Sequence, residues 1–169
     1  MTHTALQRIH TYLGVLLTTM GLLILANSLS GLYLDHETPK VDLQFKELVR
    51  FNKHDGEDNY LIQFDLMADL RPCFNWNVKQ LFVYITAEYE IPNRGESKTV
   101  VWDHIIKSQE EANLVLVDQR NKYYTTDYGT ELRDQKVTLK FNWNVMGWNG
   151  FLRTKTAGES SFTLPKEYY

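Results

Sequence analysis

The stretch FNWNVKQLFVYITAEYE, residues 74–90, carries a pattern that predicts the fold class of this chain. In its second half an apolar side chain recurs at every other position: Leu81, Val83, Ile85, Ala87 and Tyr89. A period of two places all of these side chains on one face of a strand, because successive residues of a strand point to opposite sides. The pattern therefore predicts a β-strand with one buried face.

The same period continues on both sides of this stretch. Residues 60–70 and 137–145 alternate in the same way, and shorter candidate strands lie at 41–51, 99–106, 114–117 and 160–164. Charged or glycine-containing breaks separate them at 53–58, 92–95 and 147–150, and only 110–113 is typical of a helical turn. Seven short strands without a water-soluble helix predict an all-β domain, an antiparallel β-sandwich.

Residues 11–34 carry no charged side chain, and their core is LGVLLTTMGLLILA at 13–26. A helix of that length rises about 36 Å, which is enough to cross a hydrocarbon core of about 30 Å. Arg8 precedes the run, whereas Asp35 and Glu37 follow it. The positive-inside bias then predicts a short cytosolic tail at 1–10, a transmembrane helix at 11–34 and a domain across the membrane at 35–169.

A cleaved signal peptide is the alternative for the same segment. The apolar stretch 13–25 is followed by the small residues of Ala26-Asn27-Ser28, which imitate a cleavage site. The uncharged run continues beyond this point to Leu34, and that continuation favours an anchor.

Four small residues lie on one stripe of the predicted helix. They are Gly14, Thr18, Gly21 and Ser28. Small side chains let two helices approach closely in a bilayer, so these residues are candidates for packing against another membrane helix. The alternative is that such residues are simply common in membrane spans.

Composition excludes several classes of protein. The 169 residues carry 18 Lys and Arg against 21 Asp and Glu, so the net charge is -3 and no basic field favours nucleic acid. Apolar residues make up 43% of the chain, which is ample for a packed core. Cys73 is the single cysteine, and it can form neither an intrachain disulfide nor a cysteine-rich zinc site.

Motifs of catalysis are absent from the sequence. It contains no GxSxG elbow, no HExxH, no glycine-rich phosphate loop and no paired Cys and His at ligand spacing. His104 follows Asp103, but neighbours in a strand point to opposite faces and cannot easily pair. We therefore predict no catalytic residue, no cofactor and no metal site.

Two alternative functions remain open from the residues alone. Glu88 and Glu90 share a strand face about 7 Å apart, a spacing that a glycoside hydrolase could use. Exposed aromatic side chains could instead stack on sugars, with Trp148 as the best candidate, whereas Trp143 alternates with core residues and is expected to be buried. The pentapeptide FNWNV occurs at 74–78 and at 141–145, and we interpret this repetition as coincidence because the flanking residues differ.

The opening stretch, preceded by DLMADL at 65–70, resembles the central motif of signal peptidase complex subunit 3, the 22/23 kDa microsomal subunit family. Further matches follow in order: VVWDHII at 100–106, NKYY at 121–124 and VTLKFNWNVM at 137–146. The resemblance covers essentially the whole chain. Many relatives carry a glycosylation sequon before the VTL strand, whereas no Asn-x-Ser/Thr occurs here.

The resemblance implies a non-catalytic accessory subunit of the complex that removes signal peptides from secretory precursors. It implies a single-pass type II protein of the endoplasmic-reticulum membrane with a luminal C-terminal domain. The expected partners are the catalytic subunit, other membrane subunits and the lipid bilayer, with precursors contacted only indirectly. Candidate docking residues are Trp76, Asn77, Lys79, Gln80, Glu88, Tyr89, Trp102 and Asp103. The alternative is that several of these close turns and satisfy the domain's own backbone.

Overall fold

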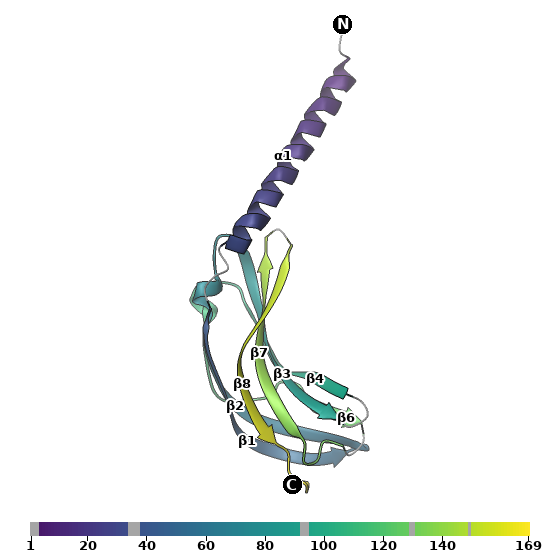
Figure 1. The fold of residues 1–169 in the computed structure, drawn as a ribbon, viewed down its shortest axis with the longest axis vertical. Coiled ribbons are helices and arrows are strands. Elements are labelled where there is room, and N and C mark those ends of the chain that lie inside the picture. The colour runs from purple at the N-terminus through teal and green to yellow at the C-terminus, as the bar shows by residue number, and fades with distance from the viewer. Residues whose placement is uncertain (1–3, 34–37, 92–94, 129–130, 149) are drawn as a thin grey trace.

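The computed structural model describes residues 4–33, 38–91, 95–128, 131–148 and 150–169. The N-terminal helix α1, Ala5–Tyr33, stands apart from a C-terminal β-domain (Figure 1). It begins before the predicted residue 11, because Arg8 joins the first turn by donating its backbone N–H to the Thr4 carbonyl. Predicted residues 1–3 of the tail and Leu34 lie outside the described residues.

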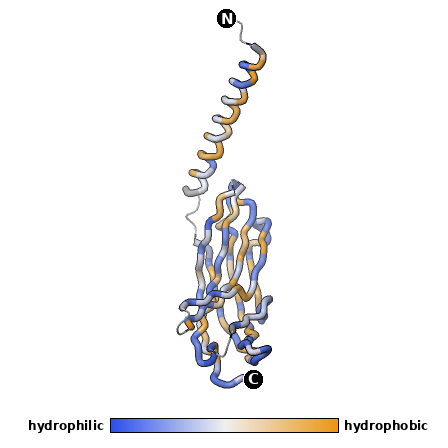
Figure 2. Tube along the Cα trace, turned by 90° about the vertical axis from the view of Figure 1, so that its right-hand side faces the viewer, coloured by the Kyte–Doolittle hydropathy of each residue, from blue (hydrophilic) through white to orange (hydrophobic). Residues whose placement is uncertain are grey.

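Helix α1 is long and apolar enough to cross a membrane over Ala5–Gly31. None of its most apolar window is buried against the rest of the chain, and Figure 2 shows this apolar helix extending away from the domain. An apolar helix without a covering protein surface is typical of a segment that meets lipid.

Within the described residues, the β-domain consists of two antiparallel sheets of four strands each. In the first sheet, β2 (Glu57–Asp69) pairs with β1 (Lys40–His54), β5 (Asn113–Arg120) and β6 (Thr125–Tyr128). The second sheet has the order β4-β3-β7-β8, with β4 at Gly95–Ile106, β3 at Val78–Ile91, β7 at Lys136–Gly147 and β8 at Leu152–Thr163. The predicted antiparallel all-β domain is confirmed.

The inner faces of both sheets contribute to one hydrophobic core. Ile62 and Phe64 of β2 enter it from one side, and Ile85 of β3 and Phe141 of β7 enter it from the other, all fully buried. These are the residues that the period of two placed on the buried face. Trp143 is also buried, as predicted.

Strands β1 and β8 bring the two sheets together along one side. The rings of Phe45 and Phe162 stack with centroids 4.1 Å apart, and the backbone N–H of Phe45 donates to Ser160 Oγ at 2.9 Å. Gly158 has a φ of +74°, and a Cβ there would lie 2.7 Å from Cγ1 of Val41. Glycine is therefore required where β8 passes β1.

The two copies of FNWNV adopt different structures. The first lies between the 3₁₀ turn η1 (Arg71–Cys73) and the start of β3, whereas the second lies inside β7. Trp76 of the first copy is exposed, and Trp143 of the second is buried. This difference agrees with the interpretation that the repetition is coincidental. The predicted helical turn is present as the 3₁₀ turn η2, Glu110–Ala112.

Candidate functional site

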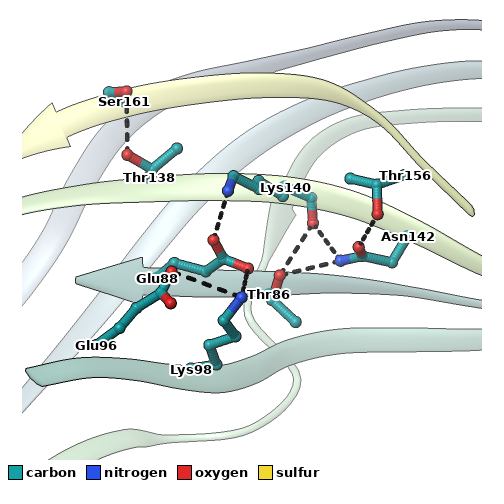
Figure 3. Close-up of polar contacts among 9 residues, drawn as sticks. All are labelled: Thr86, Glu88, Glu96, Lys98, Thr138, Lys140, Asn142, Thr156 and Ser161. Atoms are coloured by element: carbon teal, nitrogen blue, oxygen red, sulfur yellow. Dashed lines mark hydrogen bonds and ion pairs between the residues drawn. The ribbon is translucent and has the colours of Figure 1, made fainter. Parts of the chain in front are cut away.

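A cluster of charged side chains lies on the outer face of the second sheet, centred on Glu88 of β3. Its Oε1 lies 3.1 Å from Nζ of Lys98 on β4, and its Oε2 lies 2.6 Å from Nζ of Lys140 on β7. Lys98 also approaches Glu96 Oε1 at 3.5 Å. Figure 3 shows the two lysines reaching the carboxylate from the strands on either side of it. We call Glu88, Lys98, Lys140 and Glu96 the Glu88 cluster.

The surroundings of Glu88 on a central strand explain why its carboxyl group is ionised. Its side chain is only 10% exposed, and this burial alone would raise the pKa of the carboxyl. Hydrogen bonds from Lys140 and Lys98 outweigh the burial, so the pKa of Glu88 lies below its ordinary value. A general acid of a glycosidase needs a raised pKa. The cluster is therefore arranged as a structural ion pair and does not favour the hydrolase alternative.

Beside the Glu88 cluster, a hydrogen-bonded chain crosses three strands. Asn142 Nδ2 donates to Thr86 Oγ1 at 3.0 Å and to the Lys140 carbonyl at 3.1 Å, and Thr156 Oγ1 donates to Asn142 Oδ1 at 2.7 Å (Figure 3). The registers of β7 with β8 and of β3 with β4 both shift at this level. Side-chain amides and hydroxyls thus satisfy polar groups where bulges interrupt the ladders.

The same outer face changes to aromatic and apolar residues toward the start of β3. Phe82 and Tyr84 stack with centroids 5.4 Å apart, and Ile105, which pairs with Phe82, is 44% exposed. Asn144, also opposite Phe82, has a buried Oδ1 without a hydrogen-bond partner in the described part of the chain. An open groove of about 750 Å³ lies at the other end, lined by residues that include Glu88, Glu90, Lys136 and Lys140.

The structure distributes the predicted docking residues over several places. Trp76 and Lys79 are exposed, and Gln80 is half-buried with Nε2 3.2 Å from the sulfur of Met146. Asn77, Tyr89 and Trp102 are buried. Buried side chains can shape a docking surface but do not themselves present one.

Asp103 and His104 do not form a base and its orienting partner. The Asp103 carboxylate accepts hydrogen bonds from Lys122 Nζ at 2.8 Å and from Tyr123 Oη at 2.6 Å, and these bonds lower its pKa. The His104 ring lies against Trp102 instead, with centroids 6.0 Å apart. Asp103 therefore links β4 to the loop that precedes β6.

A joint connects the last turns of α1 to the second sheet. Asn77 Nδ2 donates to the Asn27 carbonyl at 3.4 Å, and Arg153 Nη1 of β8 donates to the Gly31 carbonyl at 2.9 Å. Gly31 is buried, and a Cβ there would lie 2.8 Å from Asn77 Nδ2. The guanidinium satisfies a free carbonyl and opposes the negative end of the helix dipole. Asn77 was predicted from its motif as a docking residue and not as part of this joint, and Gly31 and Arg153 carried no local signal.

The small-residue stripe of α1 is divided between two environments. Gly14 and Gly21 have open space where a Cβ would lie, and Thr18 Oγ1 donates back to the carbonyls of Gly14 and Val15. Ser28 Oγ donates to the Ile24 carbonyl at 2.9 Å and lies at the joint. Packing of this stripe against another helix stays a prediction.

The residues that the structure describes contain no group of three or more His, Cys, Asp or Glu side chains able to hold a metal ion. Among these residues, the Glu88 cluster joins three strands of one sheet. In the part of the chain that the structure describes, one candidate membrane helix precedes a β-domain of two antiparallel sheets, which is the architecture of a membrane-anchored β-domain protein.

Comparisons with known proteins identify the family. A family model described as "Signal peptidase subunit" matches residues 2–167. The protein named "Signal peptidase complex subunit 3" of Dictyostelium discoideum is 36% identical over 169 residues, which cover 98% of this chain and 96% of that protein. The human protein of the same name is 33% identical over 174 residues, with 98% and 96% coverage. The chain belongs to the signal peptidase subunit family, as its motifs predicted.

Proposed function

We propose that this chain is a non-catalytic accessory subunit of the signal peptidase complex in the endoplasmic-reticulum membrane. In this proposal α1 is a single-pass type II anchor, and the two sheets form a luminal β-sandwich. The observation that carries the proposal is the family match over nearly the whole chain, together with relatives named as subunit 3 of that complex. The fold supports it, since a long apolar helix precedes a separate β-domain.

The outer face of the second sheet is the docking surface that we propose for the catalytic subunit. It combines the Phe82–Tyr84 stack and the exposed Ile105 with a buried oxygen of Asn144 that lacks a partner in the described residues. Exposed aromatic and apolar side chains gathered on one sheet face are typical of a surface that a partner covers. On the same face, the Glu88 cluster joins β4, β3 and β7 through its ion pairs.

The chain offers a matched pair of variants for testing this face. Ile105 lies on the edge strand β4 of the second sheet, and Val115 lies on the edge strand β5 of the first sheet. Both side chains are β-branched and point outward, and they are 44% and 58% exposed. Ile105→Lys and Val115→Lys therefore introduce the same charge at equivalent positions of opposite faces.

The test is affinity purification of tagged, full-length variants from native membranes in mild detergent. We expect the wild type and Val115→Lys to recover the catalytic subunit, and Ile105→Lys to recover at least tenfold less of it. Normal recovery with Ile105→Lys and loss with Val115→Lys would assign docking to the first sheet. Depletion of the chain is expected to reduce precursor cleavage, and restoration of cleavage by Glu88→Gln would support a role without catalysis by this residue.

A further inference from the structure

Apolar side chains gather at the end of the β-domain that faces α1. Trp76 precedes β3, whereas Trp148, Phe151 and Leu152 lie at or beside the turn between β7 and β8. All four side chains are more than half exposed. We call these four residues the helix-end patch. Figure 1 shows the tip of β7 and β8 beside the end of α1.

Hydrogen bonds through Asn77 hold the helix-end patch in place relative to α1. The Trp148 backbone N–H donates to the Asn77 carbonyl at 3.0 Å, and Asn77 in turn donates to the Asn27 carbonyl of α1. A groove of about 250 Å³ lies between α1 and the β-domain. Leu25, Ser28 and Leu29 line it on the helix, and Phe151 lines it on the β-domain. The helix-end patch therefore lies at the level of the last two turns of α1.

The length of α1 determines what surrounds those turns. The candidate span Ala5–Gly31 has 27 residues, and such a helix rises about 40 Å, more than the hydrocarbon core of about 30 Å. The excess of about 10 Å places turns at the ends of this span in the layers of lipid headgroups, and the final turns of α1 form one of these ends. Tryptophan is enriched in that layer, because its ring is apolar while its indole N–H donates a hydrogen bond.

We infer that the helix-end patch inserts into the headgroup layer of the bilayer that α1 spans and holds the β-domain against the membrane surface. This inference rests on the proposed anchoring by α1. Lipid is the occupant because the patch is continuous with the lipid-facing surface of the helix. Lys79 supports this chemistry, since its Nζ lies 5.5 Å from the Trp148 ring centroid and brings a positive charge to the level of lipid phosphates.

Tryptophan fluorescence of the full-length protein in phosphatidylcholine nanodiscs tests the inference. The quencher is a lipid with a nitroxide on its headgroup, and iodide in solution probes exposure to water. Trp102 and Trp143 are buried and provide an internal unquenched reference. The variants are Trp148→Phe, Trp76→Phe and their combination, and the control is Tyr124→Trp, which places an indole at an exposed site beside β6.

We expect the headgroup nitroxide to quench the wild type, and the double variant to lose at least half of that quenching. The added indole of Tyr124→Trp should respond to iodide only. Quenching of Trp76 and Trp148 by iodide without quenching by the lipid would overturn the inference while leaving the anchor intact. Failure of the protein to remain with the nanodiscs would instead overturn the proposed anchor, and the inference with it.

Discussion

Replacing Glu88 by glutamine tests whether the Glu88 cluster stabilises the second sheet. The substitution keeps the size of the side chain but removes the charge that two lysines share. Lys98 and Lys140 would then face each other across β3, with Glu96 still 3.5 Å from Lys98 but no carboxylate between the two lysines. The perturbation therefore removes two attractive interactions and leaves one repulsive interaction.

The expected loss of stability follows from exposure and distance. A hydrogen bond to a charged group contributes about 1.5–3 kcal/mol, whereas an exposed ion pair contributes about 0.2–1 kcal/mol. Glu88 is nearly buried, but Lys140 is 33% and Lys98 is 54% exposed, so both pairs are partly screened. We expect Glu88→Gln to lower the free energy of unfolding by about 1–3 kcal/mol, most of it through Lys140 at 2.6 Å.

Denaturant unfolding of the full-length protein in detergent, followed by near-ultraviolet circular dichroism, measures this loss. Glu90→Gln is the matched control, because Glu90 is an exposed glutamate on the same face of the same strand. The control should change stability by less than about 0.5 kcal/mol. Double-mutant cycles with Lys140→Met and Lys98→Met should give the larger coupling for Lys140. Equal stability of Glu88→Gln and Glu90→Gln would show that the ion pairs of Glu88 do not stabilise the second sheet.

The dependence of stability on pH provides an independent check of the same cluster. The pKa of Glu88 is lowered in the folded protein, so its contribution is present above the ordinary carboxyl pKa of 4.5. It is lost as the pH falls through the lower folded pKa. The difference in stability between the wild type and Glu88→Gln should therefore shrink on acidification below that ordinary value. A difference that stays constant there would contradict the role of the ionised carboxylate.

Two further predictions concern β8 and the end of β2. Gly158 and Gly56 both have a positive φ, so replacing either by alanine should cost about 1–2 kcal/mol. Gly158→Ala should cost more than Gly56→Ala, because only at Gly158, of these two positions, would the added Cβ meet Val41. Equal losses in thermal unfolding would exclude a role for that contact. The Arg71 side chain donates to the carboxylate of Asp69 and lowers its pKa to about 2, so NMR titration should show this midpoint and Arg71→Gln should raise it toward 3.8.

Alternation of apolar residues predicted the strands that lie at the centre of the sheets. Strands β2, β3 and β7 each bury one face in the core, so hydrophobic burial imposes a visible period of two on their sequences. Strand β6 has only four residues and was not predicted. Strand β8 was predicted only at 160–164, whereas it begins at Leu152. It is an edge strand with few buried residues, and pairing with β7 stabilises it without an apolar pattern.

The anchor-like helix, the antiparallel strands and the family could be predicted from the amino-acid sequence, because each depends on a local pattern or a contiguous motif. The tertiary structure was needed to show that Lys98 and Lys140 share Glu88, since strand register brings together residues of three separate strands. It also decided that Arg153 reaches the carbonyl of Gly31, 122 positions earlier in the chain. Such contacts depend on the three-dimensional path of the backbone, so they cannot be predicted from spacing along the sequence.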